Sequence, residues 1–489
     1  MPPRPHRTAK SDAHPTRSPA VGPRHNGSIT RSRGVQYANA STIHRLPLEV
    51  LSEIFILAMP TIQEIYAWPS SQTSERQNTV DPSKFCAVCS SWRLLAFSTP
   101  QLWKHVFVHV PYSITKDRAK KMVADLVPWI ERSKPLPLTL HISGDLNVSL
   151  HGTGPEAPIV SFLIDHAARW ESLYCKRTFL DRSSYLPPPR FHVDVWHSLR
   201  RVCLVGIKSC YVTSCVILKN TLPWAQLTLL NVQNNITVSQ AETVFISCPK
   251  LVQLSISVRM SAGEGTGGVS ITLRDLVTFY LSTDSTCRTL AVNRLSSPSL
   301  RNMFIDGFSS ADIGILLDFF TRSSCTLDKL GIRGLQNIAP RDYINVLQHR
   351  SCQSLTFLTL CYPLWHKDDM SLDLDEALLQ RLTLHRNDTI CSRLKFLTIT
   401  YSVPSSLHST FLNMVESRIR SHVGQITDEP TLQYLQLHVR CPGKEMKELD
   451  KIGKRSGMEY RRQRIRPCHW EVWFQCEVPP SLNPNELLF

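Results

Sequence analysis

One short apolar template occurs nine times between residues 199 and 437, and this repetition constrains the fold more than any other feature of the chain. Each copy places large apolar residues at its first, fourth and sixth positions. The copies are 199–204, 224–229, 251–256, 276–281, 300–305, 327–332, 355–360, 394–399 and 432–437. Their fourth positions lie 24 to 28 residues apart, and nearly 40 apart at the last two steps. A period of this length predicts stacked units that each bury an apolar face against the next unit.

The segments between the copies favour helices, so the sequence predicts strands that alternate with helices. The helical stretches are 157–168, 239–247, 311–321, 342–349, 375–384 and 409–420. Three looser units precede the array, around 106–110, 136–142 and 170–175. A cysteine stands just before four of the copies, at Cys248, Cys325, Cys352 and Cys391, which indicates a small buried side chain at a fixed turn.

A different pattern occupies the region before the repeats. Pro47 suits the first turn of a helix, and the apolar stripe that follows ends at Pro60. A second helix is expected from Asp81-Pro82 to the residue before Pro100. The two stripes and the residues that cover them are Leu46, Val50, Leu51, Ile54, Phe55, Ala58, Phe85, Val88, Cys89, Trp92, Leu95, Leu102 and Trp103. The polar stretch 69–79 between the two helices indicates a surface loop.

These residues resemble an F-box of the form common in mushroom-type fungi. The matching motifs are Leu46-Pro47, Glu49-Val50-Leu51, Ile54-Phe55, Val88-Cys89, Ser91-Trp92-Arg93 and Thr99-Pro100-Gln101-Leu102-Trp103. The resemblance covers 43–106 and departs from the common F-box in the longer stretch 61–81. The array beyond it resembles the leucine-rich-repeat half of F-box proteins of the same kind.

The resemblance implies that the first module binds the adaptor subunit of a cullin-RING (SCF-type) ubiquitin ligase. Two short helices cannot bury so many apolar residues against each other, and a partner is a natural cover. The alternative is that these residues pack on the first repeat. The expected adaptor-binding residues are Leu46, Pro47, Val50, Leu51, Ile54, Phe55, Val88, Trp92, Leu95 and Trp103.

The repeat strands are expected to present a second surface, which would bind a target protein that the sequence does not identify. Mixed polar and aromatic residues at the second and third variable positions of the template suit protein recognition. The alternative is a solvated sheet face without a ligand. The expected target-binding residues are Arg201, Gln253, Tyr280, Lys329, Arg333, Phe357, Phe396, Tyr434 and His438.

The charge of the chain is uneven. The formal net charge is +15, of which residues 1–40 contribute +6 and residues 443–466 contribute +5. The arm 1–40 has no amphipathic pattern, which predicts disorder, with a nuclear-import or acidic-partner segment as the alternative. The basic stretch 444–466 favours a last unit that caps the array over nucleic-acid contact. A nucleic-acid partner is therefore disfavoured for the whole chain.

Candidate sites for catalysis, cofactors and metals each have a simpler structural explanation. The glycine-rich segment 263–268 matches a dinucleotide motif, yet no helix is expected to follow it. Cys86 and Cys89 have the spacing of a metal pair without a second pair, and Cys468-His469 with Cys476 lacks a fourth ligand. The sequence therefore predicts no enzyme activity, no cofactor and no metal.

Fifteen scattered cysteines, the absence of a signal peptide and the lack of a long apolar run predict a cytoplasmic or nuclear protein without a membrane partner. The expected fold class is α/β. It comprises a disordered basic arm at 1–40, a short helical F-box at 41–106, a leucine-rich-repeat-like α/β solenoid at 107–466 and a tail at 467–489. The expected function is recruitment of substrates to the ligase, with a non-ligase leucine-rich-repeat scaffold as the alternative.

Overall fold

The computed structural model of the chain describes residues 46–60, 81–111, 114–144, 155, 157–176, 198–205, 223–259, 270–283, 292–334, 339–361, 376–384, 389–402, 407–419, 432–440, 443–455, 459–466 and 469–475. The arm 1–40, the loop 69–79 and the glycine-rich segment 263–268 lie outside these residues. The chain separates into two compact units, Met1–Val50 and Leu51–Phe489. In the first unit the described residues are 46–50, which are exposed.

Short helices occupy the region of the expected F-box. They are α1 (Leu48–Leu57), α4 (Ser83–Cys86), α5 (Ser90–Ser98) and the 3-10 turn η3 (Pro100–Trp103). The single helix expected after Asp81 is wrong, because Cys89 interrupts it with an extended backbone (φ −158°, ψ 172°). The Cys89 Sγ accepts the backbone N–H of Trp92 at 3.4 Å, so this residue caps α5 instead of continuing α4.

The rest of the second unit contains a 14-stranded sheet and a two-stranded sheet among the described residues. Neighbours in the large sheet, in order, are β1 (His105–Val110), β2 (Leu138–Gly144), β3 (Trp170–Lys176), β4 (Arg201–Val205), β5 (Leu229–Thr237), β6 (Gln253–Arg259), β8 (Thr278–Thr283), β10 (Asn302–Phe308), β11 (Lys329–Gly334), β12 (Phe357–Cys361), β13 (Phe396–Ser402), β14 (Tyr434–Arg440), β16 (His469–Gln475) and β15 (Glu459–Arg466). The pairings from β1 to β14 are parallel, and the last two are antiparallel. The small sheet pairs β7 (Ile271–Thr272) with β9 (Leu295–Ser296).

The fourth positions of the template form one continuous row across the parallel strands. From β1 to β14 the row is Val106, Leu140, Leu173, Val202, Leu230, Leu254, Phe279, Met303, Leu330, Leu358, Leu397 and Leu435. All twelve side chains are buried in one hydrophobic core. The three looser units are confirmed as strands β1, β2 and β3, and they continue the same row.

The expected register is wrong in one copy. The apolar template predicts Leu227 at the fourth position of 224–229, whereas Leu230 pairs with Val202 and Leu254. Trp224 instead begins the 3-10 turn η6 (Trp224–Gln226), and Leu227 takes the first position. Four large apolar residues within seven positions allowed both alignments, and pairing with the neighbouring strands selects one of them.

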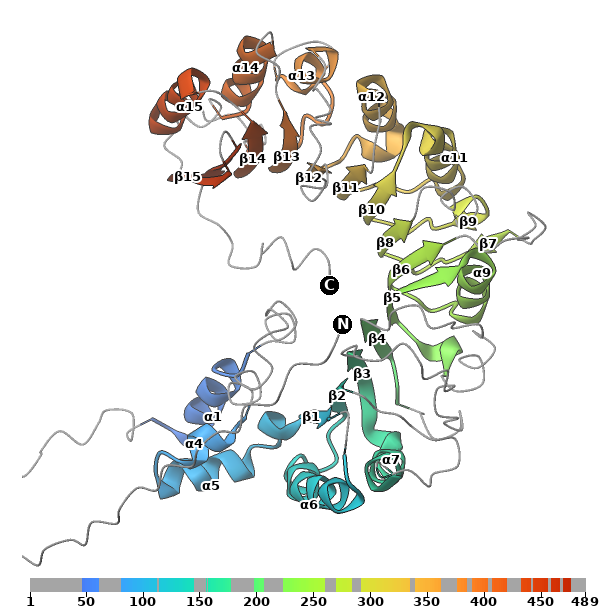
Figure 1. The fold of residues 1–489 in the computed structure, drawn as a ribbon, viewed down its shortest axis with the longest axis vertical. Helices are drawn as coiled ribbons and strands as arrows, with labels where there is room; N and C mark the ends of the chain where they lie inside the picture. Colours follow the sequence, from blue (N-terminus) through green and yellow to red (C-terminus); the bar gives the residue numbers. More distant parts are fainter. Residues whose placement is uncertain are drawn as a thin grey trace, which may run out of the picture. The chain divides into compact units, whose positions relative to one another are not determined.

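The helices that follow the strands lie along one face of the sheet, as Figure 1 shows. They are α6 (Lys116–Arg132), α7 (Ala157–Asp165), α9 (Val238–Ser247), α11 (Ile313–Ser323), α12 (Pro340–Gln348), α13 (Glu376–Leu382), α14 (His408–Ile419) and α15 (Gly443–Arg455). Short 3-10 turns accompany them at η4 (Ala167–Arg169), η7 (Ser310–Asp312) and η8 (Arg350–Cys352). The protein is therefore a mixed α/β structure with a large parallel sheet, and we call the face away from these helices the open face.

The four cysteines that precede template copies are buried free thiols, as expected. Burial raises the pKa of Cys248 and that of Cys391 to about 12, which keeps both thiols protonated at neutral pH. Their role in the described structure is therefore to fill small spaces in the core at the turn before each strand.

The end of the chain differs from the expected tail. Residues 469–475 form β16, which pairs antiparallel with β14 and with β15. These last strands reverse the direction of the sheet, so the final parallel strand has a partner on both edges. The basic stretch contributes α15 and β15 to this end of the sheet.

Candidate functional site

The first candidate site is the surface of the helices α1, α4 and α5. An aromatic cluster within the second unit supports them: the rings of Phe55 and Phe85 stack with centroids 4.4 Å apart, and Trp92 lies tilted at 4.8 Å from Phe55. Such aromatic pairs stabilise a small module beyond the area that they bury. The helices therefore have an internal core of their own.

Trp103 joins these helices to the first strand-and-helix unit. Its indole N–H donates to the carbonyl oxygen of Ala96 at 2.8 Å, and its ring meets Trp129 of α6 edge-on at 5.0 Å. The guanidinium of Arg132 lies over Phe97 at 4.2 Å and over Trp103 at 4.7 Å. Part of the expected adaptor-binding set therefore packs on the first repeat, which was the alternative explanation.

The structure separates the ten expected adaptor-binding residues by exposure. Leu51, Phe55, Leu95 and Trp103 are buried, and Trp92 is partly buried. Leu46, Pro47, Val50, Ile54 and Val88 are exposed. Solvent therefore reaches half of the set, while the buried members hold the helices in place.

Four exposed large apolar residues of these helices are absent from the expected set, and the first of them is Leu48, which is 60% exposed at the start of α1. Leu57 is 82% exposed at the end of α1, Leu94 is 70% exposed on α5, and Phe97 is 36% exposed. Ile54 and Val88, at 40% and 59%, belong to the same group of large apolar side chains that the described structure leaves in solvent. Leu94 and Phe97 are three residues apart, and this helical spacing could have identified both from the sequence.

The second candidate site is the open face of the parallel sheet, where the third and fifth template positions lie. The residue directly after each six-residue copy lies on the same face, and we count it as the seventh position. The expected target-binding residues on it are Arg201, Gln253, Tyr280, Lys329, Arg333, Phe357, Phe396 and Tyr434, and the side chain of His438 lies outside the described structure. At the third position, Lys329 pairs in register with Phe357. Phe357 pairs in turn with Phe396, and Phe396 pairs with Tyr434. The array thus brings four members of the expected set side by side.

A polar network occupies the seventh positions of β10 and β11. Asp306 Oδ2 accepts the hydroxyl of Tyr280 at 3.3 Å and pairs with Arg333 Nη1 at 3.4 Å. Burial, with the Asp306 carboxylate next in effect, raises the pKa of Tyr280 to about 12. The phenol therefore stays a hydrogen-bond donor at neutral pH, and it holds Asp306 in position. The sequence did not indicate Asp306 as a site residue, because a single polar residue in a strand forms no recognisable motif.

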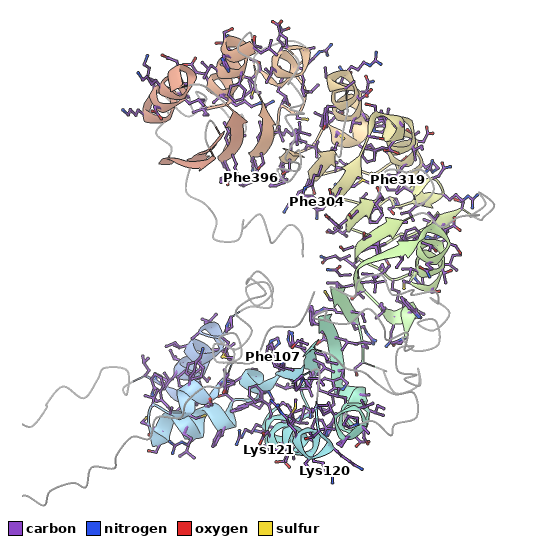
Figure 2. All side chains as sticks on the ribbon, viewed as in Figure 1. Phe107, Lys120, Lys121, Phe304, Phe319 and Phe396 are labelled. Carbon is purple, nitrogen blue, oxygen red and sulfur yellow. The ribbon has the colours of Figure 1, made fainter. Side chains whose placement is uncertain are left out.

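An aromatic row crosses the same strands. The ring of Phe304 lies over Gly331, where an added Cβ would approach Phe304 Cδ1 to 2.4 Å. Phe304 meets Phe357 edge-on at 6.5 Å, and Phe357 lies 6.1 Å from Phe396. Figure 2 labels Phe304 and Phe396 on the side of the sheet away from the helices. Phe304 was also missed, because the glycine that accommodates its ring lies 27 residues further along the chain.

A second aromatic group lies on the first three strands. The ring of His141 stacks on Phe107 at 4.3 Å and on Tyr174 at 5.1 Å. His105 Nδ1 lies 3.3 Å from His141 Nε2, a hydrogen bond whose direction depends on the tautomers. Burial, and then the charge of Lys104, lowers the pKa of His105 to about 4. Burial, and then His105, lowers the pKa of His141 well below its usual range.

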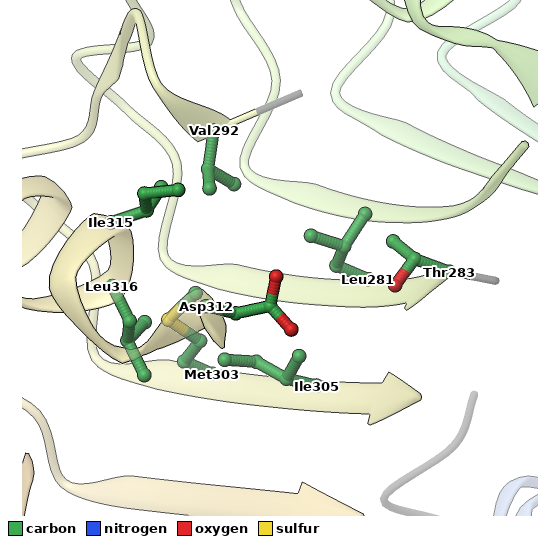
Figure 3. A pocket seen from close by; sticks show the side chains of 8 residues that line it. All are labelled: Leu281, Thr283, Val292, Met303, Ile305, Asp312, Ile315 and Leu316. Atoms are coloured by element: carbon green, nitrogen blue, oxygen red, sulfur yellow. The ribbon is translucent and has the colours of Figure 1, made fainter. Parts of the chain in front are cut away.

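A small pocket lies between the sheet and α11 (Figure 3), and its volume is about 20 Å³. Its lining residues are Leu281, Thr283, Val292, Met303, Ile305, Asp312, Ile315 and Leu316. Asp312 Oδ2 accepts the backbone N–H and the hydroxyl of Ser309, which explains this carboxylate as a helix cap. A cavity of this size holds about one water molecule, so it is no site for a substrate.

Chemistry-bearing clusters are sparse in the part of the chain that the structure describes. Within it, no group of three or more His, Cys, Asp or Glu side chains is arranged to hold a metal ion. Cys86 is buried and Cys89 caps α5, which explains this pair without a ligand. No described helix combines the length and the apolar character needed to span a membrane.

Comparison with known proteins found no family model that matches the chain and no curated protein that matches its sequence.

Proposed function

We propose that this protein is a substrate-recruiting F-box subunit of a cullin-RING ubiquitin ligase. The helices α1 and α5 would bind the adaptor, and the open face would bind the target. The protein would act by position, since it raises the concentration of target lysines near an enzyme bound elsewhere in the complex. It would itself be non-catalytic and need no cofactor.

One observation carries this proposal. The helices have their own aromatic core, yet Ile54, Leu57, Val88 and Leu94 remain in solvent. A module that needed these residues only for folding would bury them, whereas an adaptor that lays an apolar groove on the helices would cover them. The F-box-like motifs supply the identity of that adaptor as an expectation.

The test is binding of the purified chain to the recombinant adaptor, measured by calorimetry or by co-elution from a sizing column. Ile54→Asp combined with Val88→Asp should weaken binding at least about a hundredfold, because apolar anchors at the centre of an interface dominate its energy. Ile246→Asp is the matched control, since Ile246 on α9 is 64% exposed and lies outside the helical module. Circular dichroism should be unchanged in both proteins.

If the wild-type chain does not bind the adaptor, the ligase proposal is wrong and the non-ligase scaffold replaces it. If Ile246→Asp weakens binding as much as the double variant, the helices are not the adaptor site.

A further inference from the structure

The open face of β10 to β13 combines aromatic rings and cations in one local arrangement. Lys329 and Arg333 occupy the third and seventh positions of β11, and Gly331 lies between them at the fifth. Because Gly331 has no side chain, the Phe304 ring of the neighbouring strand lies over this position. Strand β11 therefore presents two basic side chains on either side of an aromatic ring from β10.

The charges of this region do not cancel. Among the described open-face side chains of β10 to β13, Lys329 and Arg333 are cations and Asp306 is the carboxylate. Asp306 holds one N–H group of Arg333, whose side chain is still 41% exposed. A guanidinium has five N–H donors, so Arg333 can bind a second carboxylate while it keeps the first. Lys329 adds an ammonium two positions before Gly331.

The aromatic rings limit what kind of polyanion fits. Phe304 and Phe357 are 7% and 6% exposed, so their faces are not free to stack on bases. Phe396, which lies between Phe357 and Tyr434 in the third-position row, is only partly buried and can receive one flat apolar group. These features favour a protein segment over a nucleic acid.

We propose that Lys329, Arg333 and Phe396 form a docking surface for an acidic segment of a partner protein that carries one aromatic anchor. The carboxylates of the segment would pair with Lys329 and Arg333 on β11, and its aromatic side chain would pack beside Phe396. This docking surface rests on the proposed function in one respect, namely that the open face binds the target.

The experiment measures fluorescence anisotropy of the full chain with labelled synthetic peptides. One short peptide combines Asp and Glu with a single Phe; a second replaces the acids by Asn and Gln; a third replaces the Phe by Ala; and a labelled single-stranded oligonucleotide serves as the other polyanion. The acidic Phe peptide should bind at least about tenfold more tightly than each of the other three probes.

Two matched pairs of variants assign the effect to the surface. Lys329→Glu with Arg333→Gln should lower the affinity for the acidic Phe peptide at least about tenfold. Lys120→Glu with Lys121→Gln makes the same change in charge on α6, away from the open face (Figure 2), and should leave the affinity within about twofold. Gly331→Ala should displace the Phe304 ring and reduce the preference for Phe over Ala, whereas Thr359→Ala on β12 should not.

Equal binding of the acidic and neutral peptides overturns the proposal, as does tighter binding of the oligonucleotide. An equal loss in the α6 control shows non-specific attraction and also overturns it. None of these results depends on the adaptor. Failure here therefore leaves the adaptor proposal standing, and loss of adaptor binding leaves the peptide preference measurable.

Discussion

The guanidinium of Arg418 donates from Nε to the carbonyl oxygen of Leu382 at 2.6 Å, in the interior of the protein. Its Nη atoms donate to the carbonyl oxygens of Cys391 and Ile390 at 3.3 and 3.2 Å. One arginine of α14 thus satisfies three buried carbonyl groups around the end of α13 and the turn before β13. Burial lowers the pKa of Arg418 to about 10, so the side chain remains charged at neutral pH.

Replacement of this arginine should destabilise the protein strongly. Arg418→Met removes the donors and leaves three carbonyl groups unsatisfied, at about 1 to 3 kcal/mol for each buried group. We expect a loss of at least about 3 kcal/mol in the free energy of unfolding, measured by urea titration. Arg350→Met is the control, because Arg350 is exposed and donates to the Ser324 hydroxyl at the surface. Equal stability of Arg418→Met and wild type would contradict this account.

Adjacent residues of β12 should respond very differently to truncation. Leu358 is in the fourth-position row, so Leu358→Ala should cost about 2 to 5 kcal/mol. Thr359 lies on the open face, and Thr359→Ala should stay within about 0.5 kcal/mol of wild type. Thermal unfolding of the two variants checks the register directly, since a shift by one residue would exchange the two results.

Stability should fall on acidification because of the histidines on β1 and β2. In the unfolded chain a histidine takes up a proton near pH 6.5, whereas folded His105 does so only near pH 4. The unfolded state therefore binds more protons between these values, and the folded state loses stability as the pH falls from about 6.5 to about 4, by up to about 3 kcal/mol for His105 alone.

The measurement is the melting temperature at pH 7 and at pH 4.5. His105→Gln with His141→Gln should lower this pH sensitivity, because glutamine keeps a hydrogen-bonding group without a proton to gain. His109→Gln serves as the control, since His109 is exposed on the same strand. A double variant as acid-sensitive as wild type would show that other groups cause the effect.

The buried thiols should resist alkylation in the folded protein. Cys248 and Cys391 have pKa values raised to about 12, and the thiolate is the reactive form. Iodoacetamide at pH 8 should leave both residues unmodified, as read by peptide mass spectrometry, while guanidinium chloride makes them react fully. Rapid modification of either residue without denaturant would show that the turn before its strand opens.

Much of the parallel sheet could be predicted from the spacing of apolar residues alone. Met303, Leu330 and Leu358 recur at intervals of 27 and 28 residues, and their register in the sheet follows this spacing. The prediction failed at 224–229, where Leu227 and Leu230 both fit the template and only the hydrogen bonds to β4 and β6 decide. It also failed at Cys89. The apolar stripe continues through this residue, but its extended backbone ends one helix and its sulfur caps the next.

The candidate surfaces needed the tertiary structure. Ile54 and Phe55 are neighbours in one apolar stripe, yet Phe55 is buried against Phe85 and Ile54 is 40% exposed. An apolar stripe shows which residues of a helix are apolar, but it does not show which of them pack in the core and which face solvent. The sequence by itself determined that strands repeat and that their fourth positions face a core, since burial of a regular apolar pattern depends mainly on local spacing. Contacts such as Phe304 over Gly331 or Asp306 with Arg333 join residues about one repeat apart, and only the register of neighbouring strands decides that they meet.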